Sequence, residues 1–412
     1  MKIEIDGDQL SRELEMLGAI SSEPAPVVTR IVFSEADLRA RAFVKQLCRD
    51  AGLVVREDAV GNTFARWTGR EPELPPVATG SHMDAIPNAG RYDGTVGVLG
   101  GLESIRALAR SGFHPRRSIE LIIFTSEEPT RFGIGCLGSR LIAGLLDESA
   151  GTRLKDRNNA TLDSVRAAAG FTGPLTTVAV PAGSYSAFVE LHIEQGPLLE
   201  QRHISLGIVT AIAAPATVRL WIEGEGGHAG AVLMPDRRDA FLAAAEIALA
   251  TEAAARSTGA SDTVATVGVC DIFPGAVNSI PSRVRIEIDL RDIDLARRDR
   301  VLSQIAASSA EVAARRRVTL HREVLNADAP AQCAPAVISV LADACATHSL
   351  GFERMISRAY HDSLFMSRLA PTAMLFIPCR GGVSHRPDEY ASPESIAQGT
   401  LVLAEALARL TE

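Results

Sequence analysis

The sequence has no run of about 18 or more apolar residues, so we expect no membrane-spanning helix and no membrane partner. Its first residues, M-K-I-E-I-D-G-D, lack the apolar stretch and small-residue cleavage site of a secretory signal. A basic excess is also missing, since 42 Lys and Arg against 50 Asp and Glu give a net charge of −8. Binding to nucleic acid depends on neutralising phosphates, so this charge argues against a nucleic-acid partner.

Cysteine pairs are absent as well. The six cysteines are scattered, with no C-x-x-C spacing that would indicate a zinc ribbon or a redox motif. Scattered cysteines without a secretory signal are typical of reduced, buried thiols, and we expect a cytoplasmic protein. The 412 residues, 46% hydrophobic and 22% charged, are typical of a globular chain of two or three domains.

Strand-like and helix-like segments alternate along the first half of the chain. The segment S-I-E-L-I-I-F-T at 118–125 is nearly all apolar, as expected for a strand buried on both faces. We predict helices at 34–52, 95–111 and 137–146, with Ser34 capping the first and Leu38, Phe43, Val44 and Leu47 forming its apolar face. We predict strands at 53–58, 61–67, 76–81, 118–125, 187–193 and 205–212. This alternation favours an α/β fold whose mixed, largely parallel central sheet is flanked by helices.

The middle of the chain has a different element order. A strand, a helix, two strands, a helix and a strand are expected at 216–224, 238–256, 263–273, 283–291, 293–314 and 317–325. That β-α-β-β-α-β order is typical of a ferredoxin-like α+β unit. The earlier pattern then resumes, with a helix at 335–349, a strand at 372–378 and a helix at 393–410. We therefore predict a discontinuous catalytic domain, 1–213 and 329–412, interrupted by an inserted domain at 214–328.

Four segments rich in His, Asp and Glu follow predicted strands. They are T-G-S-H-M-D-A-I-P-N-A-G-R-Y-D-G at 79–94, F-T-S-E-E-P-T-R-F-G at 124–133, E-L-H-I-E-Q-G-P at 190–197 and G-G-V-S-H-R-P-D-E-Y at 381–390. The polar residues singled out in them are His82, Asp84, Asp93, Glu127, Glu128, His192, Gln195 and His385. Ligands collect beyond the carboxyl ends of the strands in α/β sheets, so we expect these side chains to meet there.

Three histidines and several carboxylates without a cysteine suit a divalent ion such as zinc or manganese. In H-M-D, Asp84 can hold the second ring nitrogen of His82 and fix its tautomer. Of the adjacent Glu127 and Glu128, one can bind metal while the other acts as a general base towards an acidified water. Two metal ions about 3.5–4 Å apart, bridged by one carboxylate, would both activate water and polarise a carbonyl.

Together these motifs resemble the dinuclear metal-dependent amidohydrolases related to aminoacylase and carboxypeptidase. The chain is most similar to the branch with N-carbamoyl-L-amino-acid hydrolases, allantoate amidohydrolases and ureidoglycolate amidohydrolases, over essentially its whole length. The resemblance implies two metal ions per subunit: His82, Asp93 and His192 hold one, and Asp93, Glu128 and His385 hold the other. It implies manganese as the metal, while the oxygen and nitrogen ligand set also accepts zinc, cobalt or nickel.

The same resemblance assigns roles around the metal ions. Glu127 would be the general base, and Asp84 would orient His82. Gln195 and His361 would contact the substrate.

The inserted domain carries a further motif, G-E-G-G-H-A-G-A-V-L-M-P-D-R-R-D-A at 224–240. The resemblance implies that this domain forms a homodimer and acts as a lid, and that His228 reaches across the interface to stabilise an oxyanion. A-V-N-S-I-P-S at 276–282 and D-L-R at 289–291 match the family's carboxylate-binding pair. Asn278 and Arg291 would therefore grip the substrate's carboxylate, Arg291 in a bidentate fork.

Two departures from the carbamoylases and allantoate enzymes bear on the substrate. Gly227 precedes the lid histidine, and S-R-A-Y-H-D at 357–362 replaces a small Gly-Ala-Gly before the His-Asp pair. Both features resemble ureidoglycolate amidohydrolases, and Tyr360 could donate to a small substrate hydroxyl. The resemblance thus implies hydrolysis of (S)-ureidoglycolate to glyoxylate, ammonia and carbon dioxide. The alternatives are an N-carbamoyl-L-amino acid or allantoate as substrate, or a metal-free member that serves as a binding protein.

Overall fold

A computed structural model describes residues 2–412 and divides the chain into two compact units. The first comprises the described residues up to Thr210, Cys333–Ser357 and His361–Glu412, and the second comprises Ala211–Gln332 and Arg358–Tyr360. The predicted inserted domain, 214–328, lies within the second unit. None of the helices among residues 2–412 has both the length and the apolar composition needed to cross a membrane.

The first unit is built on a nine-stranded mixed sheet, with the order β15-β8-β17-β7-β4-β6-β3-β2 and with β16 paired to β8. The strands of this sheet are β2 (Val54–Glu57), β3 (Thr63–Trp67), β4 (Val77–His82), β6 (Ile119–Phe124), β7 (Ala187–Ile193), β8 (Leu206–Ile212), β15 (Ala331–Gln332), β16 (Phe352–Ser357) and β17 (Thr372–Ile377), and all but β15 belong wholly or mainly to the first unit. The four central strands, β17, β7, β4 and β6, run parallel, whereas β2, β3, β8 and β15 pair antiparallel. The predicted α/β class with a mixed sheet is confirmed, and the parallel strands lie at the centre of the sheet.

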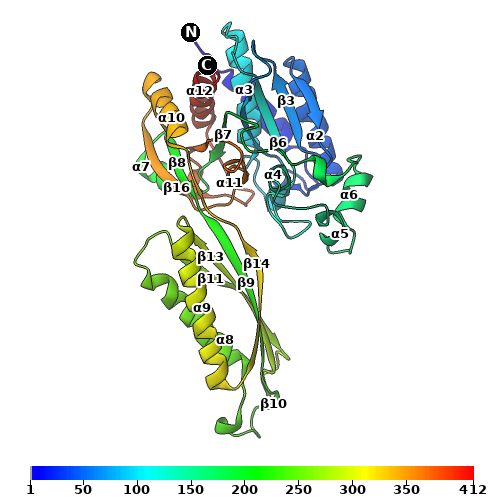
Figure 1. Ribbon diagram of the computed structural model, residues 1–412, viewed down its shortest axis with the longest axis vertical. Coiled ribbons are helices and arrows are strands. Elements are labelled where there is room, and N and C mark those ends of the chain that lie inside the picture. The colour runs from blue at the N-terminus through cyan, green and yellow to red at the C-terminus, as the bar shows by residue number, and fades with distance from the viewer. Residues whose placement is uncertain (1) are drawn as a thin grey trace. The chain divides into compact units, whose positions relative to one another are not determined.

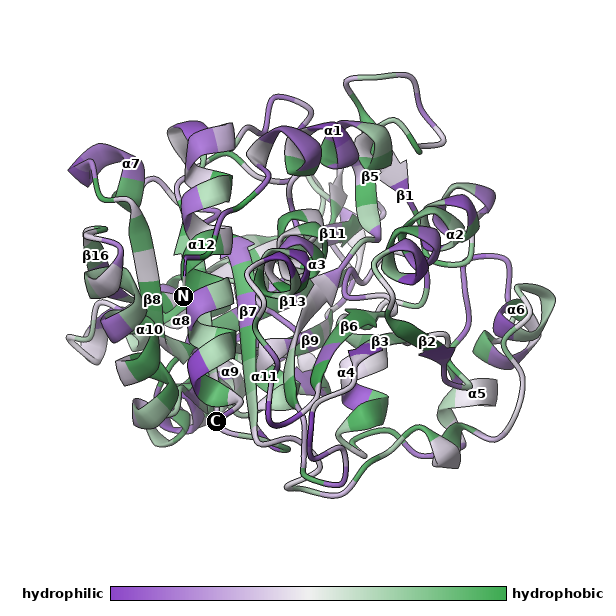
Figure 2. Ribbon diagram, turned by 90° about the horizontal axis from the view of Figure 1, so that it is seen from above, coloured by the Kyte–Doolittle hydropathy of each residue, from purple (hydrophilic) through white to green (hydrophobic). Residues whose placement is uncertain are grey.

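Helices cover both faces of this sheet (Figure 2). One face carries α3 (Thr95–Arg110) and α12 (Pro393–Leu410), which pack on each other, and α1 (Gly7–Gly18) and α10 (Pro335–Thr347) contact this pair. The other face carries α4 (Leu137–Ile142) and α11 (Ser363–Met366) over a core that includes Phe124, Phe188 and Met366. The remaining elements are α2 (Glu35–Asp50), α5 (Ala150–Arg153), α6 (Leu162–Ala168), α7 (Leu198–Arg202), the strand pair β1 (Val28–Arg30) and β5 (Ala85–Ala89), and the 3₁₀ turns η1 (Leu175–Thr177) and η3 (Arg380–Gly382).

The second unit has the element order β9 (Ala214–Glu223), α8 (Ala240–Ser257), β11 (Val264–Phe273), β13 (Arg283–Asp292), α9 (Leu295–Arg316) and β14 (Thr319–Ala327). Its four-stranded antiparallel sheet has the order β11-β13-β9-β14, and α8 and α9 pack on one face (Figure 1). Every second residue of β13 is buried, including Val284, Ile286 and Ile288, because only that face meets the helices. A short ladder of β10 (Gly227–His228) and β12 (Ser279–Ile280), and the 3₁₀ turn η2 (Met234–Asp236), complete the unit.

Element ends differ from the sequence-based predictions where turn geometry decides them. The helix predicted at 137–146 ends at Ile142 because Gly144 adopts a positive φ of 69°. The helix predicted from Ser34 begins as expected, since the Ser34 side chain accepts the Asp37 N–H. Its buried stripe, however, includes Asp37, Arg41, Val44 and Cys48, whereas Phe43 is only half-buried.

Candidate metal centre

The predicted ligands meet at one edge of the first unit's sheet. His82 is the last residue of β4, His192 is the second-last residue of β7, and Glu127 and Glu128 follow β6. Because β7, β4 and β6 are neighbouring parallel strands, their carboxyl ends lie at the same edge. Asp93 lies just before α3, whose first turn faces that edge.

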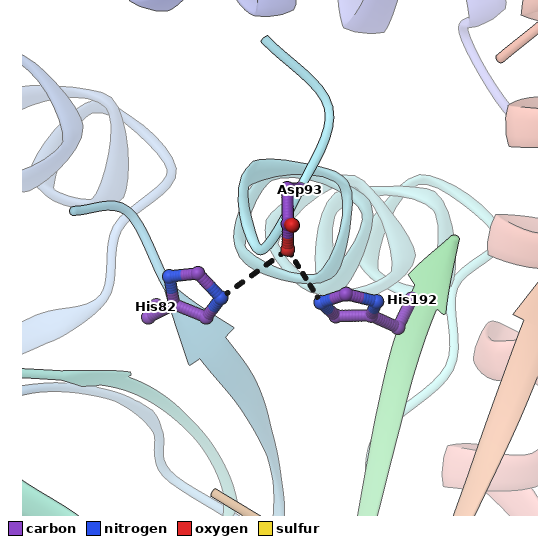
Figure 3. Close-up of side chains that lie close together, drawn as sticks. All are labelled: His82, Asp93 and His192. Atoms are coloured by element: carbon purple, nitrogen blue, oxygen red, sulfur yellow. Dashed lines mark ion pairs between the residues drawn. The ribbon is translucent and has the colours of Figure 1, made fainter. Parts of the chain in front are cut away.

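Asp93 is the centre of the first cluster (Figure 3). Its Oδ1 lies 3.5 Å from Nε2 of His82 and 3.1 Å from Nε2 of His192, and all three side chains are buried. Gly94, with φ of 66°, makes this approach possible, since a Cβ there would lie 2.6 Å from the His82 ring. These three residues offer ligand atoms within 4.8 Å of one another.

The second nitrogen of each ring is held by a main-chain carbonyl. His82 Nδ1 lies 3.1 Å from the Asp84 carbonyl oxygen, and His192 Nδ1 lies 2.9 Å from that of Ile193. A proton on Nδ1 leaves the Nε2 lone pair facing the Asp93 carboxylate. Lone pairs and a carboxylate turned towards one another in a buried place require a positive charge, so these residues fit a metal ion.

A second cluster uses the other oxygen of Asp93. His385 Nε2 lies 3.1 Å from Asp93 Oδ2 and 3.1 Å from Glu128 Oε1. The His385 side chain is 45% exposed and its main chain has φ of 58°, which is uncommon for a residue other than glycine. The two oxygens of Asp93 therefore face two separate groups of ligands, as a bridging carboxylate does.

Glu127 lies beside the clusters without joining either. Its Oε2 is 3.9 Å from His82 Nε2, and its Oε1 accepts a hydrogen bond from the Cys136 thiol at 3.4 Å. Burial raises the pKa of the Glu127 carboxyl well above its ordinary value, and the negative charge of Glu128 adds to the increase. A carboxylate with a raised pKa is a stronger base, which suits proton transfer near neutral pH.

Asp84 holds the turn that carries the two glutamates. Its Oδ1 accepts the N–H of Glu127 and its Oδ2 that of Glu128, both at 3.1 Å. The Asp84 carboxylate is 3.7 Å from His82 Nδ1, while the closer contact of His82 is with the main-chain oxygen of Asp84. Asp84 thus contacts His82 mainly through its main chain and fixes Glu127 and Glu128 through its side chain.

The contacts around Asp93 shift the pKa values of Asp93 and His385 in opposite directions. Burial alone would raise the pKa of Asp93, but its contacts with the rings of His192, His385 and His82 outweigh burial and hold the pKa well below its ordinary value. Hydrogen bonds to Asp93 and Glu128 raise the pKa of His385 to about 11. The site therefore concentrates negative charge where a cation would bind.

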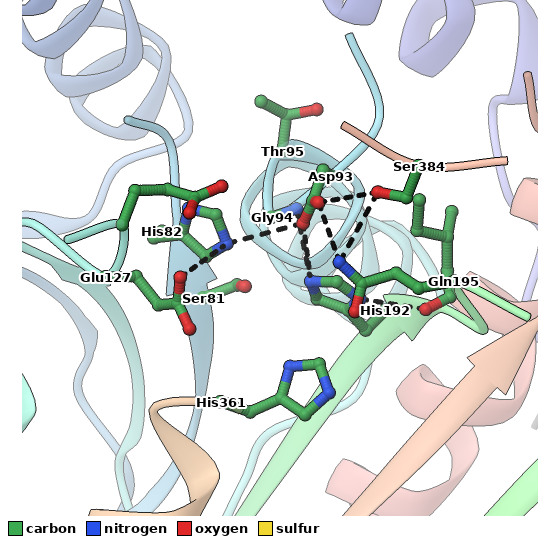
Figure 4. A network of polar contacts seen from close by, with 12 residues as sticks. Ser81, His82, Asp93, Gly94, Thr95, Glu127, His192, Gln195, His361 and Ser384 are labelled. Carbon is green, nitrogen blue, oxygen red and sulfur yellow. Dashed lines mark hydrogen bonds and ion pairs between the residues drawn. The ribbon is translucent and has the colours of Figure 1, made fainter. Parts of the chain in front are cut away.

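Two of the predicted substrate-binding residues also lie at this edge (Figure 4). Gln195 donates from Nε2 to Asp93 Oδ2 at 2.7 Å. The His361 ring packs edge-on against His192 with centroids 4.7 Å apart, and its Nε2 lies 2.8 Å from Ser357 Oγ. Burial and the neighbouring His192 lower the pKa of His361 well below its ordinary value, which favours the neutral ring.

The other four predicted residues belong to the second unit. His228 is exposed and its Nδ1 accepts the Gly230 N–H at 3.1 Å, which places the ring proton on Nε2. Arg291 pairs with Asp289 at 2.8 Å and donates to the main-chain oxygen of Arg358 at 3.1 Å. The remaining residues are Tyr360, whose hydroxyl hydrogen-bonds with Asp328, and Asn278, which is exposed.

Asn278 and Arg291 do not meet within one chain. Asn278 lies beside His228, because its carbonyl oxygen accepts the Ala229 N–H at 2.9 Å in the β10–β12 ladder. That ladder adjoins the start of β13 at Arg283, whereas Arg291 lies 291 − 283 = 8 residues farther along the strand. At about 3.4 Å per residue this separation is about 27 Å.

Comparison with known proteins identifies the family. The model of "Peptidase family M20/M25/M40" matches residues 78–409. The chain belongs to this family. It is 52% identical over 416 residues to ureidoglycolate hydrolase of Arabidopsis thaliana, covering 99% of this chain and 87% of that protein. It is 38% identical over 411 residues to N-carbamoyl-L-amino acid amidohydrolase of Geobacillus stearothermophilus, covering 99% of both chains. The crystal structure of AtUAH in complex with (S)-hydroxyglycine matches with a TM-score of 0.90 and 51% identity, covering 99% of this chain and 98% of that one.

Members of the M20/M25/M40 family are metal-dependent, and the His, Asp and Glu clusters of this chain are groups that could hold metal. Sequence reasoning missed several polar residues that support them. Ser81 Oγ and Ser363 Oγ contact the buried Glu190 carboxylate at 2.7 Å and 2.5 Å. A carboxylate within the largely apolar strand at 187–193 was the available signal for Glu190. Ser384 and Glu389 lie in the same segment as His385, at 381–390, but no pattern in the nearby sequence indicates which residues they contact.

Proposed function

We propose that this chain is a metal-dependent amidohydrolase that cleaves the ureido group of (S)-ureidoglycolate to give glyoxylate, ammonia and carbon dioxide. The observation that carries the proposal is the buried Asp93, whose two oxygens face two groups of potential metal ligands. Glu127 lies beside them without joining either group and so is free to act as a base. The substrate is supported by 52% identity to ureidoglycolate hydrolase, against 38% to the carbamoylase. The AtUAH structures in complex with (S)-hydroxyglycine and with glyoxylate support the same choice.

The ligand set is proposed to be His82, Asp93 and His192 for one ion and Asp93, Glu128 and His385 for the other. We propose manganese, since its preference for oxygen and nitrogen ligands suits this set. When bound, the ions supply acidity to the attacking water and polarise the ureido carbonyl. Glu127 accepts the proton of that water and returns it to the departing nitrogen.

His228 is proposed to stabilise the developing oxyanion, because its Nε2–H is a hydrogen-bond donor that faces away from the Gly230 contact. Asn278 and Arg291 are proposed to bind the substrate carboxylate, and Tyr360, His361 and Gln195 to contact the rest of the molecule. One carboxylate cannot reach both ends of β13, so Asn278 and Arg291 serve the same substrate only if they come from different subunits. This separation supports a homodimer formed through the second unit, in which His228 and Asn278 complete the partner's site.

We also propose that the protein acts in the cytoplasm. All six cysteines are free thiols, five of them buried, which suits a reducing compartment.

Removal of metal is expected to abolish ammonia release from (S)-ureidoglycolate. Dialysis against a chelator should lower the rate by about 100-fold or more, since the buried carboxylates and histidines then have no ion to activate water. Addition of Mn²⁺ should restore the rate, and elemental analysis before and after dialysis measures the metal content. A chelated protein that contains no metal and keeps its full rate would contradict the proposal.

A further inference from the structure

The buried carboxylate of Glu389 has no role in the proposed mechanism, but it hydrogen-bonds to the segment that carries Asp93. Glu389 lies between η3 and α12 and is 4% exposed. Its Oε1 accepts the main-chain N–H of Tyr92 at 2.7 Å and that of Asp93 at 3.1 Å. Its Oε2 lies 2.9 Å from Ser384 Oγ, which in turn lies 2.8 Å from Asp93 Oδ2. One buried carboxylate therefore reaches both the main chain and the side chain of Asp93.

Gln195 closes this network from a third segment of the chain. Its Nε2 lies 2.7 Å from Asp93 Oδ2 and 3.4 Å from Ser384 Oγ. In Figure 4, Gln195 and Ser384 converge on Asp93 from the side opposite His82. Asp93 Oδ2 is thus fixed by Gln195 and Ser384 beside His385, while Oδ1 faces His82 and His192.

The loop that precedes Asp93 packs directly on the segment that contains Glu389. A Cβ on Gly90 would lie 2.3 Å from the Glu389 Cβ, so only glycine allows this approach. The rings of Tyr92 and Tyr390 meet edge-on with centroids 6.0 Å apart. These two contacts join residues 389 − 90 = 299 and 390 − 92 = 298 positions apart in the sequence, and they pack the loop against the segment that carries Glu389.

We propose that Glu389 is a positioning residue that fixes Asp93, the carboxylate shared by both groups of metal ligands, and thereby sets the affinity for both ions. Burying a charged side chain is unfavourable unless it is hydrogen-bonded, and here its hydrogen bonds converge on one ligand. Partners that orient a metal ligand typically contribute about 10- to 100-fold in metal affinity. The inference rests on the proposed metal-dependent function, but its test does not require the substrate.

Calorimetric titration of the chelated full-length protein with Mn²⁺ tests the inference. Glu389→Ala removes the hydrogen bonds to the main-chain N–H groups of Tyr92 and Asp93 and the contact with Ser384. It should weaken both Mn²⁺-binding steps by about 10- to 100-fold. Ser384→Ala keeps the hydrogen bonds of Glu389 to the two main-chain N–H groups, so it should weaken Mn²⁺ binding less than Glu389→Ala does. Glu389→Gln keeps an oxygen for the two N–H groups and should recover part of the affinity lost in Glu389→Ala.

The matched control is Glu103→Ala on α3. Glu103 is also fully buried and accepts a main-chain N–H, that of Asp6 at 2.9 Å, but it has no contact with the clusters. This variant should lower the melting temperature of the metal-free protein and leave Mn²⁺ affinity unchanged. The inference is overturned if Glu389→Ala binds both ions with wild-type affinity, or if Glu103→Ala weakens binding equally.

Two further outcomes concern a Glu389→Ala protein that does not fold and a wild-type protein that binds no metal. If Glu389→Ala does not fold, Ser384→Ala decides, and an unchanged affinity in that variant overturns the inference. A wild-type protein that binds no Mn²⁺ or other divalent ion overturns the proposed function itself, so the two failures are distinguishable.

Discussion

Glu127→Gln is expected to lower kcat for (S)-ureidoglycolate by about 100- to 10,000-fold while both metal ions remain bound. The amide keeps the size of the side chain and can still accept from the Cys136 thiol, but it cannot take a proton from water. Glu127 belongs to none of the three groups of potential ligand atoms found among residues 2–412, the third being Glu190, His192 and His361, so elemental analysis should find the wild-type metal content.

Glu120→Gln is the matched control for this prediction. Glu120 is a fully buried glutamate on β6, the strand that leads to Glu127, and it pairs with Arg66 and Tyr185. Its substitution should affect stability more than kcat. A Glu127→Gln protein that keeps its metal and most of its kcat would remove Glu127 from the role of general base.

His228→Ala should lower kcat by about 100- to 1,000-fold with metal content unchanged, because one donor to the developing oxyanion is lost. The proposed shared site makes a sharper prediction for mixed dimers. A heterodimer of one His228→Ala subunit and one Glu127→Gln subunit has one site with an intact base and an intact donor from its partner. Purified through two different tags, it should recover about half of the wild-type rate, since one of two equivalent sites is complete.

The control for the mixed dimer is His321→Ala, which removes another exposed histidine of the second unit. This substitution should leave kcat unchanged. Two nearly inactive variants that fail to complement one another in a purified heterodimer would indicate that each site is built within a single chain.

The sequence could predict that the candidate ligands lie close together, because His82, His192, Glu127 and Glu128 stand at or just after the carboxyl ends of buried strands. His82, His192 and the pair Glu127 and Glu128 are placed together by parallel pairing alone, and that pairing follows from the alternation of strands and helices. The side chains that hold these ligands could not be predicted in the same way. Glu389 and Ser384 contact Asp93 across 291 residues or more, a distance that no local pattern spans.

The face of α2 illustrates the same limit. Helical periodicity favoured Phe43 and Leu47 as buried positions, but the helix buries the ion pair of Asp37 and Arg41. Arg41 also donates to the Gly61 carbonyl oxygen and the Thr125 hydroxyl, and these tertiary partners make a charged pair tolerable in the core. The strand β16 was missed because F-E-R-M-I-S has no alternation of apolar and polar residues, and all of its residues but Ser357 are exposed or half-buried.

The roles of Asp84 and Arg291 depend likewise on partners that lie elsewhere in the fold. The H-x-D spacing predicted that the Asp84 carboxylate orients His82, yet that carboxylate binds the two N–H groups that follow β6. Arg291 lies on β13 beside Asp289, so its guanidinium is paired, and a substrate carboxylate would compete with Asp289 for it.

The most direct test is ammonia release by the Mn²⁺-reconstituted protein with a panel of ureido acids. The panel contains (S)-ureidoglycolate, allantoate and several N-carbamoyl-L-amino acids, each assayed for kcat/KM with a chelated sample as control. We expect (S)-ureidoglycolate to be preferred by orders of magnitude and all activity to depend on metal. A higher kcat/KM for an N-carbamoyl-L-amino acid would contradict the substrate assignment, and metal-independent ammonia release would contradict the mechanism.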